Sequence, residues 1–345
     1  MFLRGINYDV GTSFRKGELS RPDFDEAIIK REIEIIKNEL NCDAIKITGD
    51  DVQRLSKASE FALEQGLQVW LTPSCIDATT EEAARHLVEC AIAAEKLRSK
   101  YGNIIFVMGF EYSMFLKGFI KGDTIYERLN YLFSPTGIVL NLLGFRRGIY
   151  KKLNAFLKEV SEDIREHFGG ELTYASGEWE KINWDPFDIV GIDHYRASYN
   201  KSFYAKQLQA YYKFKKPVAV LEFGCCAYEG AADKGPMGWA ITEMVDGQRI
   251  IKGSYVRDEA VQADYITELL DILKQEKVFA AFVFTFINPV YKYNKDPKLD
   301  LDLASYGIVK PADDAVYKGL PWVPKEAFYR LSNYYGGINK DRANE

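Results

Sequence analysis

The stretch Ile104-Ile105-Phe106-Val107-Met108-Gly109-Phe110-Glu111 is an apolar run that ends in a single carboxylate. The run Val218-Ala219-Val220-Leu221-Glu222 repeats this pattern later in the chain. Short, continuous apolar runs are typical of strands that are buried on both faces of a parallel sheet. A carboxylate is costly to bury unless it is paired or hydrogen-bonded. The two stretches therefore predict a parallel sheet that presents two carboxylates at the ends of its strands.

The rest of the chain alternates such runs with helical patterns. We expect strands at 3–8, 44–48, 68–72, 103–108, 172–175, 188–192, 218–221 and 279–285. Helical spacing of apolar residues predicts helices at about 24–39, 52–65, 81–100, 148–167, 202–212, 259–274 and 325–334. This alternation is typical of an α/β fold, the closed (β/α)8 TIM barrel. The rival is an open doubly wound sheet, whose first turn is usually rich in glycine. The first turn here, Asn7-Tyr8-Asp9-Val10-Gly11-Thr12, lacks that pattern.

The chain of 345 residues fits a single barrel domain spanning residues 1–345, because no Gly-, Ser- or Pro-rich linker divides it. One segment interrupts the alternation. Residues from about 113 to 145 carry a second apolar run and no clear strand. Long loops at the carboxyl ends of barrel strands carry specificity. We therefore expect a lid-like insertion after the fourth strand, which covers one side of the pocket or docks a partner subunit.

Composition narrows the class of protein. A net charge of −5 gives no basic field to attract nucleic acid. No apolar run is long enough for stable membrane insertion, and the first residues lack the pattern of a signal peptide. The five cysteines show no CxxC or Cys/His metal spacing and are typical of reduced thiols in the cytoplasm. We expect a cytoplasmic protein that needs no metal or other cofactor.

Active sites of such barrels lie at the carboxyl ends of the strands, where Glu111 and Glu222 would face each other across the mouth. Retaining glycosidases need two carboxylates about 5–5.5 Å apart, one as acid/base and one as nucleophile. Other strand ends supply candidate substrate-binding or supporting residues, namely Asp9, Lys46, Trp70, Glu178, His194, Tyr195 and Phe286. Some have simpler interpretations: Asp9 can cap its own turn, and His194 can be a hydrogen-bonded residue without proton transfer.

The pattern resembles clan A of the glycoside hydrolases, which includes cellulases, mannanases and β-galactosidases. In that clan the acid/base Glu ends strand four and the nucleophile Glu ends strand seven, as Glu111 and Glu222 do here. Asp193-His194-Tyr195 resembles the strand-six pair whose Tyr hydrogen-bonds the nucleophile, and Tyr306-Gly307-Ile308-Val309 resembles a recurring late segment. The Asn7–Thr12 turn and Glu222-Phe223-Gly224-Cys225-Cys226 also resemble, more weakly, a bacterial group labelled abortive-infection proteins.

The chain departs from the clan pattern at three places. Phe110 stands where the clan has the Asn that binds the sugar 2-hydroxyl. Lys46 or Thr48 stands where strand two of the clan has an Arg near the nucleophile. Phe284 and Phe286 occupy the neighbourhood of its Trp platform.

The resemblance implies a retaining glycoside hydrolase with a carbohydrate substrate. Two alternatives stay open. The first is a catalytically inactive barrel that binds carbohydrate or a protein partner, and the second is a lyase that uses Lys46 as a Schiff base. The presence of both carboxylates favours the hydrolase. The sugar, its linkage and the oligomeric state stay open, and an oligomer is compatible with the sequence.

Overall fold

Eight parallel strands close into a barrel in the computed structural model, which describes all residues except 1, 16, 135–145, 315 and 344–345. Strands that follow one another in sequence are neighbours, and the last pairs with the first. The strands are β1 (Leu3–Asp9), β4 (Ala44–Gly49), β5 (Gln68–Pro73), β6 (Ile104–Phe110), β7 (Glu171–Gly177), β8 (Val190–Asp193), β9 (Val218–Phe223) and β12 (Ala280–Val283). The predicted (β/α)8 barrel is confirmed, and each predicted strand is found within a few residues of its expected bounds.

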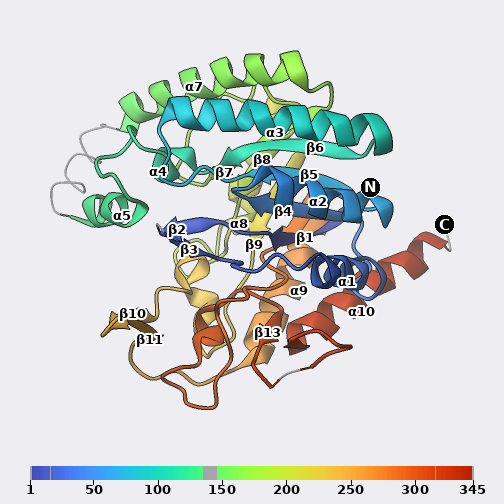
Figure 1. Cartoon of the computed structure of the whole chain (residues 1–345), viewed down its shortest axis with the longest axis vertical. Coiled ribbons are helices and arrows are strands. Elements are labelled where there is room, and N and C mark those ends of the chain that lie inside the picture. Colours follow the sequence, from blue (N-terminus) through green and yellow to red (C-terminus); the bar gives the residue numbers. More distant parts are fainter. Residues whose placement is uncertain (1, 16, 135–145, 315, 344–345) are drawn as a thin grey trace.

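Helices surround the barrel (Figure 1), and their sequences explain where they begin. The helix α3, for example, starts with a capping box in which Thr79 and Glu82 satisfy each other's backbone N–H groups. The helices are α1 (Glu26–Asn38), α2 (Val52–Glu64), α3 (Thr80–Tyr101), α4 (Tyr112–Phe115), α5 (Ile125–Phe133), α7 (Arg146–His167), α8 (Tyr204–Gln209), α9 (Glu259–Gln275) and α10 (Glu326–Ala343).

Short elements decorate the loops between the barrel strands and the helices. The strand pairs are β2 (Ser13–Arg15) with β3 (Glu18–Leu19), β10 (Thr242–Val245) with β11 (Gln248–Ile251), and β13 (Val309–Pro311) with β14 (Trp322–Pro324). Single 3-10 turns are η1 (Tyr212–Phe214), η2 (Ala231–Asp233), η3 (Gly235–Met237) and η4 (Leu301–Ala304). The pairs β2–β3 and β10–β11 lie toward one end of the molecule with α5, and the two termini lie toward the opposite end (Figure 1).

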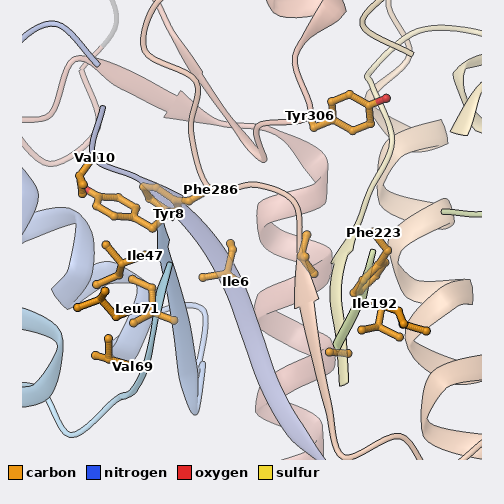
Figure 2. Packing of buried hydrophobic residues seen from close by; sticks show 14 of the residues in the cluster. Ile6, Tyr8, Val10, Ile47, Val69, Leu71, Ile192, Phe223, Phe286 and Tyr306 are labelled. Carbon is orange, nitrogen blue, oxygen red and sulfur yellow. The ribbon is translucent and has the colours of Figure 1, made fainter. Parts of the chain in front are cut away.

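The core has two layers because successive strand residues point to opposite faces. Inside the barrel, Trp70, Val107, Leu221 and Phe282 belong to one buried cluster. Outside it, a larger cluster fills the space between strands and helices. Figure 2 shows the alternate residues Ile6, Tyr8 and Val10 on one side of β1, beside Ile47, Val69 and Leu71. Each strand is therefore apolar on both faces, and polar interior side chains are exceptions that need partners.

The described part of the insertion after β6 is held at the carboxyl end of the barrel by Arg128 from α5. The Arg128 side chain is fully buried, and its guanidinium donates to the carbonyls of Met114 at 2.5 Å and Phe115 at 2.9 Å. It also pairs with Asp77, in the loop that follows β5. Residues 135–145 of the predicted lid lie outside the described residues, so its predicted role stays a prediction.

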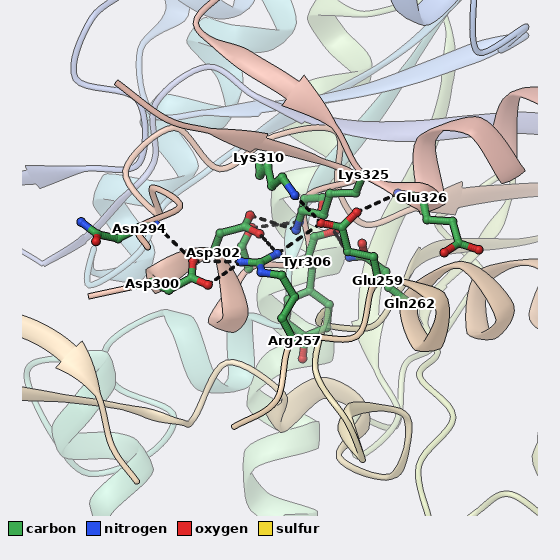
Figure 3. Close-up of polar contacts among 12 residues, drawn as sticks. Arg257, Glu259, Gln262, Asn294, Asp300, Asp302, Tyr306, Lys310, Lys325 and Glu326 are labelled. Carbon is green, nitrogen blue, oxygen red and sulfur yellow. Dashed lines mark hydrogen bonds and ion pairs between the residues drawn. The ribbon is translucent and has the colours of Figure 1, made fainter. Parts of the chain in front are cut away.

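An ion-pair network holds the long segment after β12 against α9 (Figure 3). Three cations and three carboxylates take part: Arg257, Lys310, Lys325, Glu259, Asp300 and Asp302. Lys325 and Asp302 are fully buried and lie 2.9 Å apart, so each charge is compensated where water is excluded. The network lies next to Tyr306, whose ring packs against Tyr195 at the mouth of the barrel with centroids 6.0 Å apart.

Candidate active site

A register irregularity in β9 turns Glu222 toward the barrel interior. On the β8 side Ile192 pairs with Val220, but Asp193 pairs with Glu222, so Leu221 is an extra residue. Leu221 faces the inner cluster, and strict alternation would put Glu222 on the outside. The bulge resets the alternation, because Phe223 packs in the outer layer and Glu222 points inward.

Three side chains support the Glu222 carboxylate. The Lys46 ammonium donates to Oε1 at 2.9 Å, and the Tyr195 hydroxyl lies 3.3 Å from Oε2. Lys46 also donates to Asn7 Oδ1 at 3.0 Å, while Asn7 Nδ2 donates to the carbonyl of Leu221 at 2.9 Å. The Lys46 side chain has no exposed surface, but Glu222 keeps 18% of its side chain exposed. The site thus holds a carboxylate that is paired from inside and reachable from outside.

The other glutamate, Glu111, sits on an unusual backbone. Its φ is 43°, in the left-handed region that residues other than glycine rarely adopt. The preceding strand has its own register irregularity between Val107 and Phe110. Within it Gly109 has a φ of 81°, and a Cβ there would lie 1.9 Å from the Tyr112 hydroxyl, so only glycine fits. The backbone N–H of Glu111 donates to the carbonyl of Ala175 at 2.9 Å.

Two groups from the β7 side hold the turn that follows Glu111. The Tyr112 N–H donates to the Tyr174 hydroxyl at 2.6 Å, and the Ser113 N–H donates to Glu180 Oε1 at 2.9 Å. The Tyr174 hydroxyl in turn donates to Glu180 Oε2 at 2.9 Å. Glu180 is buried, so its carboxylate serves the free N–H groups at the start of α4. This clamp fixes the direction in which Glu111 leaves the strand.

The electrostatic surroundings of Glu111 differ from those of Glu222. No hydrogen bond or ion pair to the Glu111 carboxyl is present among the described residues. Burial raises its pKa well above the usual range, and the charges of Asp193, Glu222 and Glu180 raise it further. Lys46 opposes this shift. Glu111 is therefore the carboxyl of the pair that is suited to hold a proton.

Asp193 is a third carboxyl in this group, and the sequence analysis did not select it as a site residue. It ends β8 beside Glu222 and is 3% exposed. Neither of its oxygens has a hydrogen-bond partner in the part of the chain that the structure describes. Burial raises the pKa of Asp193 well above the usual range, with the charge of Glu222 as the next cause. The signal was present in the sequence, because Asp193 precedes the predicted residues His194 and Tyr195 on the same strand end.

Two predicted residues, His194 and Glu178, lie next to each other and away from the Glu222 carboxylate. His194 Nδ1 lies 2.6 Å from Glu178 Oε1, and Nε2 donates to the carbonyl of Tyr204 at 3.2 Å. The imidazole stacks on the Tyr204 ring with centroids 4.1 Å apart. The structure thus joins Glu178 to His194, and neither contacts Glu222 through its side chain among the described contacts.

Three further predicted residues take part in turns or packing. Asp9 Oδ1 accepts the Gly11 N–H at 2.8 Å and a hydrogen bond from Ser20, so Asp9 caps its turn. Trp70 is fully buried inside the barrel, against Phe282 at a centroid distance of 4.9 Å. Phe286 is fully buried in the outer layer, against Tyr8 and Trp322. The structure does not bring Trp70 and Phe286 to an exposed surface beside Glu222.

No group of three or more His, Cys, Asp or Glu side chains among the described residues is arranged to hold a metal ion. None of the helices described is both long enough and apolar enough to cross a bilayer.

The fold is that of a class of enzymes: the chain is structurally similar to the (β/α)8-barrel glycosidases of clan A. A β-1,4-mannanase of family GH113 matches with a TM-score of 0.61 at 16% identity, over 97% of this chain and 99% of that one. The family GH113 β-mannanase from Alicyclobacillus acidocaldarius gives 0.60 at 14% identity, over 98% of both chains.

A β-glucuronidase from Bacteroides uniformis gives a TM-score of 0.60 at 13% identity, over 97% of this chain but 35% of that one. No family model matches the sequence, and no curated protein matches it. At these identities the likeness is one of fold and does not extend to the roles of individual residues.

Proposed function

We propose that this protein is a retaining glycoside hydrolase in which Glu222 is the nucleophile and Glu111 the acid/base. One observation supports the proposal above the rest: two interior carboxyls at the strand ends have opposite surroundings. Glu222 accepts from Lys46 and Tyr195, whereas burial and neighbouring carboxylates raise the pKa of Glu111. Glycosidases of this type need one carboxylate and one carboxylic acid at neutral pH.

In the first step, a Glu222 oxygen attacks the anomeric carbon of the sugar. The bond from that carbon to the leaving oxygen breaks, and Glu111 transfers its proton to the leaving oxygen. The product is a glycosyl ester of Glu222, so the negative charge of Glu222 is lost. That charge is one of those that raise the pKa of Glu111, so its pKa falls at this stage.

In the second step, the Glu111 carboxylate accepts a proton from water while the water oxygen attacks the anomeric carbon. The ester bond breaks, the sugar leaves with retained configuration, and both carboxyls return to their first state. Tyr195 and Lys46 stabilise the Glu222 carboxylate as it leaves. The departure at Phe110 removes an amide that would contact the sugar 2-hydroxyl, so specificity at that carbon must come from other residues.

The alternatives are disfavoured by the same contacts. A Schiff-base lysine must be an uncharged amine, and such lysines are activated by desolvation or by a nearby cation. The Lys46 ammonium instead donates to a carboxylate at 2.9 Å. An inactive binding barrel has no need of the strained backbone at Glu111 or of the clamp from Tyr174 and Glu180.

The test is a panel of aryl glycosides that varies the sugar and the anomeric configuration, followed by proton NMR of the first-formed product. We expect turnover of at least one glycoside, with the anomeric configuration retained. Inversion of configuration would overturn the two-step mechanism. Failure of every glycoside, together with measurable sugar binding, would favour the inactive binding barrel.

A further inference from the structure

Asp193 has no role in the two-step mechanism, yet it is a buried interior carboxyl at the end of β8, beside Glu222. It is almost fully buried, and both of its oxygens lack a hydrogen-bond partner among the described residues. A buried carboxyl without partners is costly, so its presence calls for an explanation, and a ligand group that binds it is one. The alternation of β8 points Asp193 inward, since Ile192 packs in the outer layer (Figure 2).

The charges around Asp193 are unbalanced. The groups that act on it most strongly are the carboxylates of Glu222 and Glu180 and the ammonium of Lys46. Glu180 already accepts hydrogen bonds from the N–H of Ser113 and the hydroxyl of Tyr174. Lys46 already donates to Glu222 and Asn7. Among the groups that act on Asp193, carboxyls therefore outnumber cations, and Lys46 is already bound elsewhere. A positively charged ligand group would supply both a hydrogen-bond donor for Asp193 and a second cation.

We propose that Asp193 binds a protonated amine on the sugar carbon next to the anomeric carbon, so that the substrates are glycosides of 2-amino-2-deoxy sugars. This inference deepens the proposed function and rests on it for the placement of the sugar.

The position of the amine follows from the geometry of the reaction. Glu222 must approach the anomeric carbon, and Asp193 is its neighbour, because their Cα atoms are paired across β8 and β9. Apart from its hydrogen and the leaving oxygen, the anomeric carbon is bonded only to the ring oxygen and to C2. The ring oxygen has no hydrogen to donate. The substituent on C2 is therefore the nearest donor that a carboxylate beside Glu222 can reach.

The charge of the substituent follows from the imbalance. A hydroxyl on C2 would supply a donor but no charge, and an N-acetyl group would also be neutral. A carboxylate on the sugar, as in a uronic acid, would add to the excess negative charge. An ammonium supplies up to three donors and the missing positive charge. The order of binding expected from Asp193 is amino sugar first, neutral sugar second and uronic acid last.

The experiment uses sugars without a leaving group, so that binding is measured without turnover. Calorimetry at about pH 6, where an amine is largely protonated, compares 1,5-anhydroglucitol with its 2-amino-2-deoxy and 2-acetamido-2-deoxy forms. The corresponding manno compounds are measured in parallel. The proteins are the wild type, Asp193→Asn and Glu95→Gln. Glu95→Gln is a matched control, because it removes one carboxylate from the partly exposed outer side of α3, where Glu95 pairs with Arg98.

We expect the amino form to bind at least about tenfold more tightly than the hydroxyl and acetamido forms in one of the two series. This preference should disappear in Asp193→Asn and persist in Glu95→Gln. Equal binding of amino and hydroxyl forms, a preference that survives in Asp193→Asn, or no binding of any amino form would overturn the inference. Turnover of neutral aryl glycosides without an amine preference would reject this subsite but leave the hydrolase intact. An amine preference without turnover of any glycoside would support the amine subsite but reject the hydrolase.

Discussion

The ends of β6 and β9 hold their glutamates in contrasting ways. Glu222 follows a bulge in β9 and receives Lys46 at 2.9 Å and Tyr195 at 3.3 Å. Glu111 also follows a register irregularity, but its own backbone is strained, and its neighbours are carboxylates rather than donors. Tyr174 and Glu180 hold the strained backbone after Glu111, and no hydrogen bond to the Glu111 carboxyl is present in the part of the chain that the structure describes.

This difference shows how one barrel can give two identical residue types opposite electrostatic surroundings. A carboxylate that attacks carbon needs donors that favour its charged form, and a carboxyl that delivers a proton needs surroundings that disfavour charge. The cation is placed on β4, within reach of β9. Substitutions on either side of this comparison should therefore have different effects on catalysis.

Removal of the nucleophile should have the largest effect. Glu222→Gln keeps the size of the side chain but cannot form the glycosyl ester, so kcat should fall on the order of 10⁴-fold or more. Steady-state kinetics on the best aryl glycoside measures this loss. Circular dichroism should show a folded protein. A variant with more than about a tenth of wild-type kcat would remove Glu222 from the mechanism.

Removal of the acid/base should depend on the leaving group. For Glu111→Ala we expect a loss of about 10²–10⁴-fold on glycosides with poor leaving groups, because no acid protonates the departing oxygen. The first step should be spared with an easily leaving phenolate, while hydrolysis of the ester stays slow. Added azide should restore turnover and give a product with retained configuration. The same loss for every leaving group, without azide rescue, would contradict the assignment.

Removal of the cation should weaken the Glu222 side of the comparison. In Lys46→Met the Glu222 carboxylate loses its charged donor, and kcat should fall about 10²-fold. Lys46→Arg keeps the charge and should recover part of the activity. Kinetics on one aryl glycoside compares the two variants. Equal loss in both would mean that the shape of Lys46, rather than its charge, supports the site.

Removal of the Asp193 charge should shift the pH profile on the Glu111 side. Glu111 must be protonated in the first step, so kcat/KM falls as the pH rises through its pKa. The charge of Asp193 raises that pKa, and its removal lowers it. Asp193→Asn should therefore move the alkaline limb of kcat/KM to lower pH, whereas Glu95→Gln should not. An unmoved limb in Asp193→Asn would show that the charge of Asp193 does not act on Glu111, and that burial and the other carboxylates control its pKa.

The barrel could be predicted from the sequence because its signals are local and repeated. Continuous apolar runs indicate strands that are buried on both faces, and each helix between them shows its own apolar spacing. Glu111 and Glu222 could be selected because a lone carboxylate at the end of such a run is conspicuous. Asp193 also ends an apolar run, but the polar residues His194 and Tyr195 follow it, so it is not a lone polar residue at its strand end.

The details of the site depend on features that the alternation of residues does not encode. Bulges in β6 and β9 reset which face a residue occupies, so the inward direction of Glu222 could not be derived by counting along the strand. Depth along the barrel is equally hidden, which is why Trp70 was expected near the pocket but lies in the interior packing. The clamp on Glu111 joins residues of β7 and its loop to α4, a contact between segments far apart in sequence.

The central claim is that Glu222 forms a covalent bond with the sugar while Glu111 does not. Glycosyl fluorides with fluorine also on C5 test it most directly, because they trap the ester and keep the C2 substituent. The measurement is the mass of the intact protein, followed by mapping of the labelled peptide. We predict one sugar per chain, attached to Glu222 in the wild type and absent in Glu222→Gln. A label on Glu111 or Asp193, or turnover of the fluoride without any label, would contradict the account.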